Sequence, residues 1–170
     1  MPRVLADGKR KVVFFDERPL DIKNISVAEF AAAKDGSCNI LSTGFQFGPA
    51  ASDTVEEKPL CVEGNVQALG NANAQVGMTL FRYFDADGTA DPEADWLFEM
   101  HRERGNTVWA ASLLRGVPSA ADVKASDSYH FIEYTTDTPL DQDDLTGYVK
   151  NPVTGLPQAY AFHQKVGAGA

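Results

Sequence analysis

Apolar and polar residues alternate along much of the chain, the pattern of β-strands that bury one face. The alternation is regular in residues 60–67 and 75–84, and turn-forming residues at 70–73 separate these two runs. We therefore expect one long hairpin. Its apolar face, which we expect to be buried, carries Leu60, Val62, Val66, Val76, Met78 and Leu80. Its polar face carries Glu63, Asn65, Gln67, Gln75 and Thr79, and strict alternation also places Cys61, Phe81 and Tyr83 there unless a bulge shifts the register.

Shorter runs of β-forming residues predict further strands at 11–15, 38–41, 44–47, 106–114, 128–136, 145–150 and 158–166. Ser26 and Glu29 have the spacing of a capping box, which predicts a helix over 27–34 that ends at Asp35 and Gly36, with Gly36 in the left-handed conformation. A second helix is predicted from Asp91 to Gly105. Turns rather than helical crossovers join most strands. The fold class is therefore mainly β, a sandwich or half-barrel of antiparallel strands with one flanking α-helix and a short second helix.

The chain is expected to form one domain over residues 1–170, because no repeat and no Gly/Ser-rich linker divides it. An N-terminal arm is expected over about residues 1–25. The Gly/Ala-rich residues at the other end predict a flexible tail over about residues 166–170.

The balance of acidic and basic side chains argues against some classes of function. The chain has 24 acidic and 15 basic side chains and a net charge of −9, and its longest basic run is residues 9–11. Such a balance disfavours proteins that hold nucleic acid by neutralising phosphates. The longest apolar runs are far shorter than the ~20 residues needed to cross a bilayer, and no signal segment is seen. We therefore expect a protein that does not enter a membrane and that is made and kept in a cytoplasm-like compartment.

The chemistry-bearing residues are few and scattered. Cys38 and Cys61 could form a disulfide, act as a nucleophile or supply half a metal site, but a reducing compartment favours two unbridged thiols buried on neighbouring strands. His101 with Glu103, or His130 with Glu133, could be metal or acid–base pairs. No histidine has metal-ligand spacing. We expect His101 on a helix surface, and His130 and His163 on half-exposed strand faces.

An acidic loop at residues 85–91 resembles a calcium site. It departs from the EF-hand pattern, because glycine stands at its fourth position and Trp96 at its twelfth. We expect a solvated turn whose acids cap the next helix. No nucleophile motif, phosphate loop or dinucleotide fingerprint is present, so we expect no catalytic residue, no cofactor, no metal and no enzyme.

Several landmarks occur together in a fixed order. A short helix with the sequence Ser-Val-Ala-Glu-Phe at 26–30 precedes a segment containing Cys38, a second cysteine follows at Cys61, and the aromatic run 81–85 leads to an acidic loop and a helix. Over residues 10–115 this order resembles the major tail tube protein of long-tailed phages that infect actinobacteria. The landmarks carry no catalytic chemistry.

The resemblance implies a structural virion protein that self-assembles into six-membered rings, which stack into the tail tube and conduct the genome at ejection. It implies a continuous β-barrel around a lumen, formed by hairpins of all subunits and lined here by Glu63, Asn65, Gln67, Gln75 and Thr79. The implied partners are other copies of the chain, the tape-measure protein and genomic DNA in the lumen, and the tail terminator and distal tail proteins at the tube ends. Assembly in the host cytoplasm and a place in the virion tail follow. The alternative is a small ligand- or calcium-binding β-sandwich module.

Overall fold

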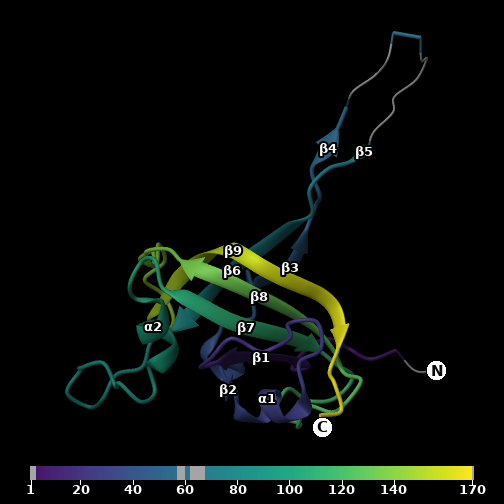
Figure 1. Ribbon diagram of the computed structural model, residues 1–170. Helices are drawn as coiled ribbons and strands as arrows, with labels where there is room; N and C mark the ends of the chain where they lie inside the picture. Colours follow the sequence, from purple (N-terminus) through teal and green to yellow (C-terminus); the bar gives the residue numbers. More distant parts are fainter. Residues whose placement is uncertain (1–2, 57–59, 62–67, 170) are drawn as a thin grey trace.

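One antiparallel sheet dominates the computed structural model, which describes residues 3–56, 60–61 and 68–169 (Figure 1). Its strand order is β2-β1-β7-β8-β9-β6-β3, with β1 (Arg10–Phe15), β2 (Lys34–Asp35), β3 (Gln46–Ala50), β6 (Asn73–Phe81), β7 (Thr107–Leu114), β8 (Ser128–Thr136) and β9 (Lys150–Lys165). A separate ribbon pairs β4 (Thr54–Val55) with β5 (Ala68–Leu69). The helices are α1 (Val27–Ala32), a 3₁₀ turn η1 (Ser37–Asn39) and α2 (Trp96–His101). The predicted fold class is confirmed.

The chain segment from β2 to β3 joins the two edges of this sheet. At one edge the Gly36 N–H donates to the Val12 carbonyl at 2.9 Å. At the other edge Ile40 forms a bridge with Leu80, and the Leu41 N–H donates to the Thr79 carbonyl at 2.9 Å. The sheet is thereby curled into a half-barrel, because one connection pairs with both of its edge regions.

Strand β9 is 16 residues long and replaces the two predicted strands at 145–150 and 158–166. The turn expected around Pro152 does not form, because residues 150–155 pair with β6. Proline is tolerated there since β8 ends opposite Gly155, and the chain beyond β8 uses only the Pro152 carbonyl, which accepts from the Leu140 N–H at 2.9 Å. Two register shifts against β8 bend the strand, and His163 adopts a φ of 52° near one of them.

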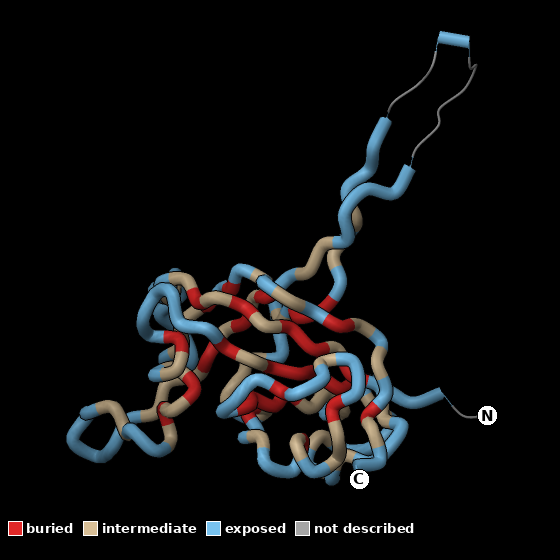
Figure 2. The backbone as a smooth tube through the Cα atoms, in the orientation of Figure 1, coloured by how far each residue is buried: buried red, intermediate tan, exposed pale blue. Residues whose placement is uncertain are grey.

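Both faces of the sheet are buried around β1 (Figure 2). One face packs against α2 in a cluster formed by Val12, Phe14, Phe47, Val76, Met78, Leu80, Leu97, Val108, Ala110, Ile132, Tyr134 and Val153. The other packs against α1 in a cluster formed by Val13, Phe15, Ile25, Phe30, Ala111, Leu113, Tyr129, Phe131, Ala161 and Val166. Alternation along β1 explains this arrangement, because successive apolar side chains enter opposite clusters.

The predicted hairpin of residues 60–84 has the wrong partner for its second strand. Strand β6 pairs with β3, from Gln46 opposite Gly77 to Ala50 opposite Asn73, and β4 and β5 continue this hairpin away from the body (Figure 1). Leu60 is fully exposed rather than buried, and Val62 and Val66 lie outside the described residues. Period-2 alternation identifies a strand but carries no information about its partner.

The first helix is shorter than predicted. The capping box forms, with the Ser26 hydroxyl accepting from the Glu29 N–H, but α1 ends at Ala32 because residues 34–35 pair with β1. Gly36 has a φ of −105° rather than a left-handed one. It is glycine because a Cβ would lie 2.6 Å from the Phe14 ring. The strand predicted at 38–41 is instead η1 followed by the Ile40 bridge, and the strand predicted at 44–47 starts at Gln46 and extends to Ala50.

The second helix and the C-terminal residues also differ from expectation. Helix α2 starts at Trp96, because Asp91 caps a preceding turn, its Oδ1 accepting from the Glu93 and Ala94 N–H groups. Strands β7 and β8 lie where they were predicted. In the expected tail, Val166 is buried and Gly167 exchanges hydrogen bonds with Ile25 and Val27, so these residues belong to the fold.

Candidate functional site

Among the described residues, no helix covers the outer face of β6 and its two neighbours. Helix α1 packs against the sheet near β1 and β2, which stand at the opposite end of the strand order from β6 and β3 (Figure 1). Because Val76, Met78 and Leu80 point into the core, the alternate positions on β6 point outward. Strand register places the outward positions of the three strands side by side. Lys150, opposite Phe81, stands at one end of this face, and the positions beyond it are uncharged: Gln46, Gln75, Gly77, Thr79, Pro152 and Thr154.

Two of the five lumen residues predicted from the sequence lie on this outer face. Gln75 is exposed and Thr79 is half-buried. Glu63, Asn65 and Gln67 lie outside the described residues. Gln46 and Thr154 were missed because the sequence does not reveal that β3 and β9 flank β6; both are exposed and extend the polar face.

A projecting arm, defined here as residues 51–56 and 68–72 with the β4–β5 ribbon, continues from this face (Figure 2). Its base is held by Asn73, whose Nδ2 donates to the Ala51 carbonyl at 3.0 Å and to Asp53 Oδ1 at 2.9 Å. Val55 and Leu69 on the arm are exposed.

At one end of the half-barrel a buried ion pair holds two loops. Asp95 is buried, and its Oδ2 lies 2.8 Å from Nη2 of Arg82. The Arg82 guanidinium also lies 3.6 Å from the centre of the Phe98 ring. In the acidic loop, Asp85 Oδ1 accepts from the Asp87 and Thr89 N–H groups, which is turn geometry. Over the residues described, no three His, Cys, Asp or Glu side chains gather as a metal site.

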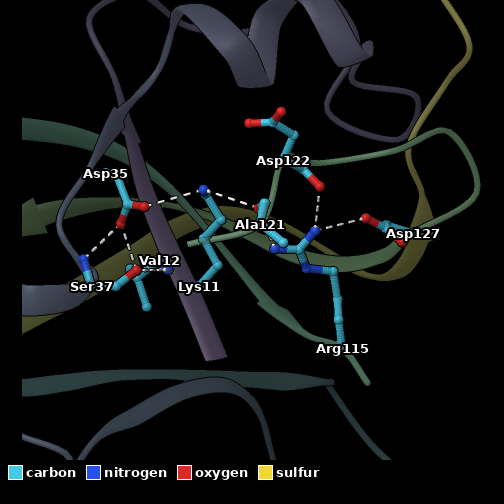
Figure 3. A network of polar contacts seen from close by, with 8 residues as sticks. All are labelled: Lys11, Val12, Asp35, Ser37, Arg115, Ala121, Asp122 and Asp127. Carbon is cyan, nitrogen blue, oxygen red and sulfur yellow. Dashed lines mark hydrogen bonds and ion pairs between the residues drawn. The ribbon is translucent and has the colours of Figure 1, made fainter. Parts of the chain in front are cut away.

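At the opposite end, charged side chains attach the 115–127 loop to β1 and join the two ends of this loop (Figure 3). Lys11 Nζ lies 3.2 Å from Asp35 Oδ2 and donates to the Ala121 carbonyl. Burial raises the pKa of Asp35, but hydrogen bonds from Ser37 and Lys11 outweigh it and leave that pKa below its usual value. Arg115 donates to Asp127 Oδ2 at 3.1 Å and to two loop carbonyls. These contacts are structural.

The predicted exposed position of His101 is wrong. It is buried, with Nδ1 donating to the Leu97 carbonyl at 2.8 Å and Nε2 accepting from the Tyr134 hydroxyl at 2.7 Å. The ring faces inward because it lies one turn after Leu97 on α2, on the face that packs against the sheet. Burial lowers the pKa of His101. Within the described residues it makes no hydrogen bond with Glu103.

The other two histidines lie on strand faces, as predicted. His130 is half-buried and His163 exposed, and the His163 N–H donates to His130 Nδ1 at 3.2 Å. Burial, with His163 nearby, lowers the pKa of His130. The proposed pairing of His130 with Glu133 does not form, because Glu133 accepts from Trp109 Nε1 and from Arg18.

The cysteines are free, and the expected burial on neighbouring strands is wrong. Cys38 is exposed in η1, and Cys61 is exposed in a turn at residues 60–61. Neither segment is a strand of the sheet, so neither thiol is covered. Of the helices in the described residues, none is long and apolar enough to cross a membrane.

The described chain is thus a curled antiparallel sheet with a projecting arm. In a comparison with known families, the model of the phage tail tube protein family matches residues 1–170. The chain belongs to this family. Membership implies a structural, non-enzymatic component of the virion tail. A search of curated proteins finds no match.

Proposed function

We propose that this protein is the subunit of the tail tube of a long-tailed phage infecting actinobacteria. Copies assemble in the host cytoplasm into six-membered rings that stack into a tube, and the tube conducts the genome at ejection. The observation that carries the proposal, beside family membership, is the outer face of β3, β6 and β9, which is uncharged around Gln75 and Thr79, with its adjoining arm.

A neutral wall suits a conduit for DNA. Cationic side chains bind phosphates, whereas amide and hydroxyl groups leave a passing duplex free to move. Gln75 and Thr79 supply such groups on β6, and Gln46 and Thr154 do so on the neighbouring strands. In the proposed tube these side chains line the lumen, together with Glu63, Asn65 and Gln67 from the rest of the hairpin.

The projecting arm offers strand edges with which the arms of neighbouring subunits can pair to form the barrel. Strands β4 and β5 form a ribbon of two strands only, and such a ribbon is marginally stable alone. Exposed strand edges accept further strands. In the proposed ring, arms of neighbouring subunits pair and close the barrel. The tape-measure protein and DNA occupy the lumen, and the terminator and distal tail proteins bind the tube ends.

Electron microscopy of the concentrated, purified protein tests the assembly. Tubes whose end views average to six-fold rings with an open lumen are expected. A protein that stays monomeric by light scattering at every concentration would refute the proposal and favour the ligand-binding alternative.

Lysine substitutions test the lumen. Gln75→Lys with Thr79→Lys leaves folding intact, because the first position is exposed and the second half-exposed, and it places two rings of cations on the wall. Tubes of this variant should retain short duplex DNA at low salt, while wild-type tubes should not. The matched control is Ala32→Lys, an exposed position on α1. Equal DNA retention by the two variants would show that β6 does not line the lumen.

A further inference from the structure

The two ends of the half-barrel carry opposite charge. Residues 83–95 and 137–149 contain no Lys or Arg and hold nine of the 24 acidic side chains: Asp85, Asp87, Asp91, Glu93, Asp95, Asp137, Asp141, Asp143 and Asp144. Asp95 pairs with Arg82 and Asp137 with Arg104, and in the described chain the other seven lie in no ion pair. Residues 3–11, in contrast, hold Arg3, Lys9, Arg10 and Lys11 against Asp7 alone.

Between the two acidic loops lies an apolar groove, defined here by Cys38, Phe81, Arg82, Tyr83, Phe84 and Tyr148, with a volume of about 450 Å³. Tyr148 is 79% exposed and Phe84 44% exposed. The Phe81 and Tyr148 rings meet edge to face. The one cation of the groove, Arg82, is already paired with Asp95. The groove therefore offers exposed aromatic surface within a negative rim.

The N-terminal segment, defined here as residues 3–9, has the complementary chemistry. Val4 is 58% exposed and Leu5 83% exposed. Arg3 and Lys9 flank them and form no ion pair in the described part of the chain. The segment is anchored at its end, where the Ser119 N–H donates to the Gly8 carbonyl at 2.9 Å. It is thus a short apolar strip between two unpaired cations.

Strand register places the groove and the N-terminal segment at opposite ends of one subunit. Phe81 pairs with Lys150 at the start of β9. The start of β9 lies toward the end of β8, and the end of β8 pairs with the start of β7. Arg10 pairs with Leu114 at the end of β7. One copy therefore cannot bring its own two surfaces together. Complementary patches at opposite ends make a head-to-tail contact, which repeats without closing when it runs along one axis.

We propose that the groove of one copy receives the N-terminal segment of a second copy, with Val4 and Leu5 against the aromatic rings and Arg3 and Lys9 among the acidic side chains. This contact joins subunits along the strand direction. The inference rests on the proposed tube assembly, in which the contact would join one ring to the next.

Disulfide trapping tests the contact, with the native Cys38 thiol as reporter. In a Cys61→Ser background, Val4→Cys and Leu5→Cys are introduced separately, because neighbouring side chains point in different directions. Assembled protein is oxidised with copper phenanthroline and resolved on a non-reducing gel. A disulfide requires the two Cα atoms to lie within about 7 Å. Leu20→Cys, at a fully exposed position outside the segment, is the matched control, and Cys61→Ser alone reports Cys38–Cys38 linkage.

We expect a ladder of dimers, trimers and longer species for at least one of the two N-terminal variants and none for the controls. Normal tubes without a ladder from either variant would overturn this inference and leave the proposed function standing. Absence of rings and tubes in the unsubstituted protein would overturn both. Bands that stop at the dimer would also contradict the inference, because a head-to-tail contact does not stop there.

Charge reversal provides a second test. Arg3→Glu with Lys9→Glu should raise the concentration needed for tube formation about threefold to tenfold, since two surface ion pairs are lost. Adding Asp141→Arg and Asp144→Arg should restore assembly. Lys23→Glu, an exposed cation beside α1, is the control and should have no effect. Reversal without loss of assembly, or loss without restoration, would contradict the pairing.

Discussion

Replacing Tyr134 by phenylalanine should weaken the fold through a single lost hydrogen bond. The Tyr134 side chain is fully buried, and its hydroxyl donates to Nε2 of His101, which is also buried. The His101 tautomer is fixed because Nδ1 faces the Leu97 carbonyl, which can only accept. Tyr134→Phe therefore leaves an acceptor nitrogen without a partner in a place that water does not reach.

The expected cost follows from desolvation of that nitrogen. An unsatisfied buried polar group costs about 1–3 kcal/mol. For a chain of this size each kcal/mol lowers Tm by about 2–4 °C, so a loss of about 2 kcal/mol corresponds to roughly 4–8 °C. Tyr160 is the control, because its hydroxyl donates to the Ala72 carbonyl at 2.8 Å but the residue is 37% exposed. Tyr160→Phe should cost under about 0.5 kcal/mol, because water replaces the lost donor.

Urea denaturation followed by tryptophan fluorescence, at concentrations below those that give assemblies, measures both variants. A double-mutant cycle with His101→Leu should give a coupling energy of about 0.5–3 kcal/mol between the two side chains. Equal losses for Tyr134→Phe and Tyr160→Phe, or a coupling energy of zero, would refute the reasoning.

Three further predictions address pH, metal and packing. Burial lowers the pKa of His101 in the folded protein, so the unfolded chain binds more protons once the pH falls below the unfolded pKa of about 6.5. The free energy of unfolding should then fall by up to about 1.4 kcal/mol per pH unit. Urea titrations from pH 7.5 to 5.5 should therefore show a steeper loss of stability for wild type than for His101→Leu. Chelator should leave Tm unchanged, because Asp85 Oδ1 is engaged by backbone N–H groups; a fall of several degrees would restore the calcium interpretation. Gly155→Ala should cost about 1–3 kcal/mol in urea titrations, because its Cβ would overlap the buried Tyr134 ring, whereas Gly77→Ala meets no atom closer than 3.7 Å and should be neutral.

Local signals predicted the elements better than the pairings. The capping box at Ser26 and the β-branched, aromatic run of residues 128–136 act over a few residues, and both gave correct positions. The partner of β6 depends on contacts between residues far apart in sequence. Alternation in residues 60–67 resembled a strand for the core, but Leu60 is fully exposed, and residues 62–67 lie outside the described residues.

Long-range pairing also explains the misread turn in β9. Asn151, Pro152 and Gly155 together are strong turn residues in isolation. The ladder with β6 supplies a partner strand along residues 150–155 and outweighs that local preference. Gly155 is present for a different reason, since any side chain would collide with Tyr134. A sequence reading without tertiary contacts cannot separate these two uses of glycine.

Charge placement connects the two proposals and separates their consequences. Acidic side chains gather at one end of the strands and cations at the other. Between them, the outer face of β3, β6 and β9 is uncharged around Gln75 and Thr79. In the proposed assembly, the acidic end of one subunit attracts the basic end of the next along the tube, while the lumen wall does not bind DNA phosphates. A charge placed on the wall should therefore change DNA retention at constant assembly, and a charge reversed at an end should change assembly at constant retention per tube. If Gln75→Lys with Thr79→Lys blocked assembly as strongly as Arg3→Glu with Lys9→Glu, the two surfaces would not have the separate roles that their positions in the fold imply.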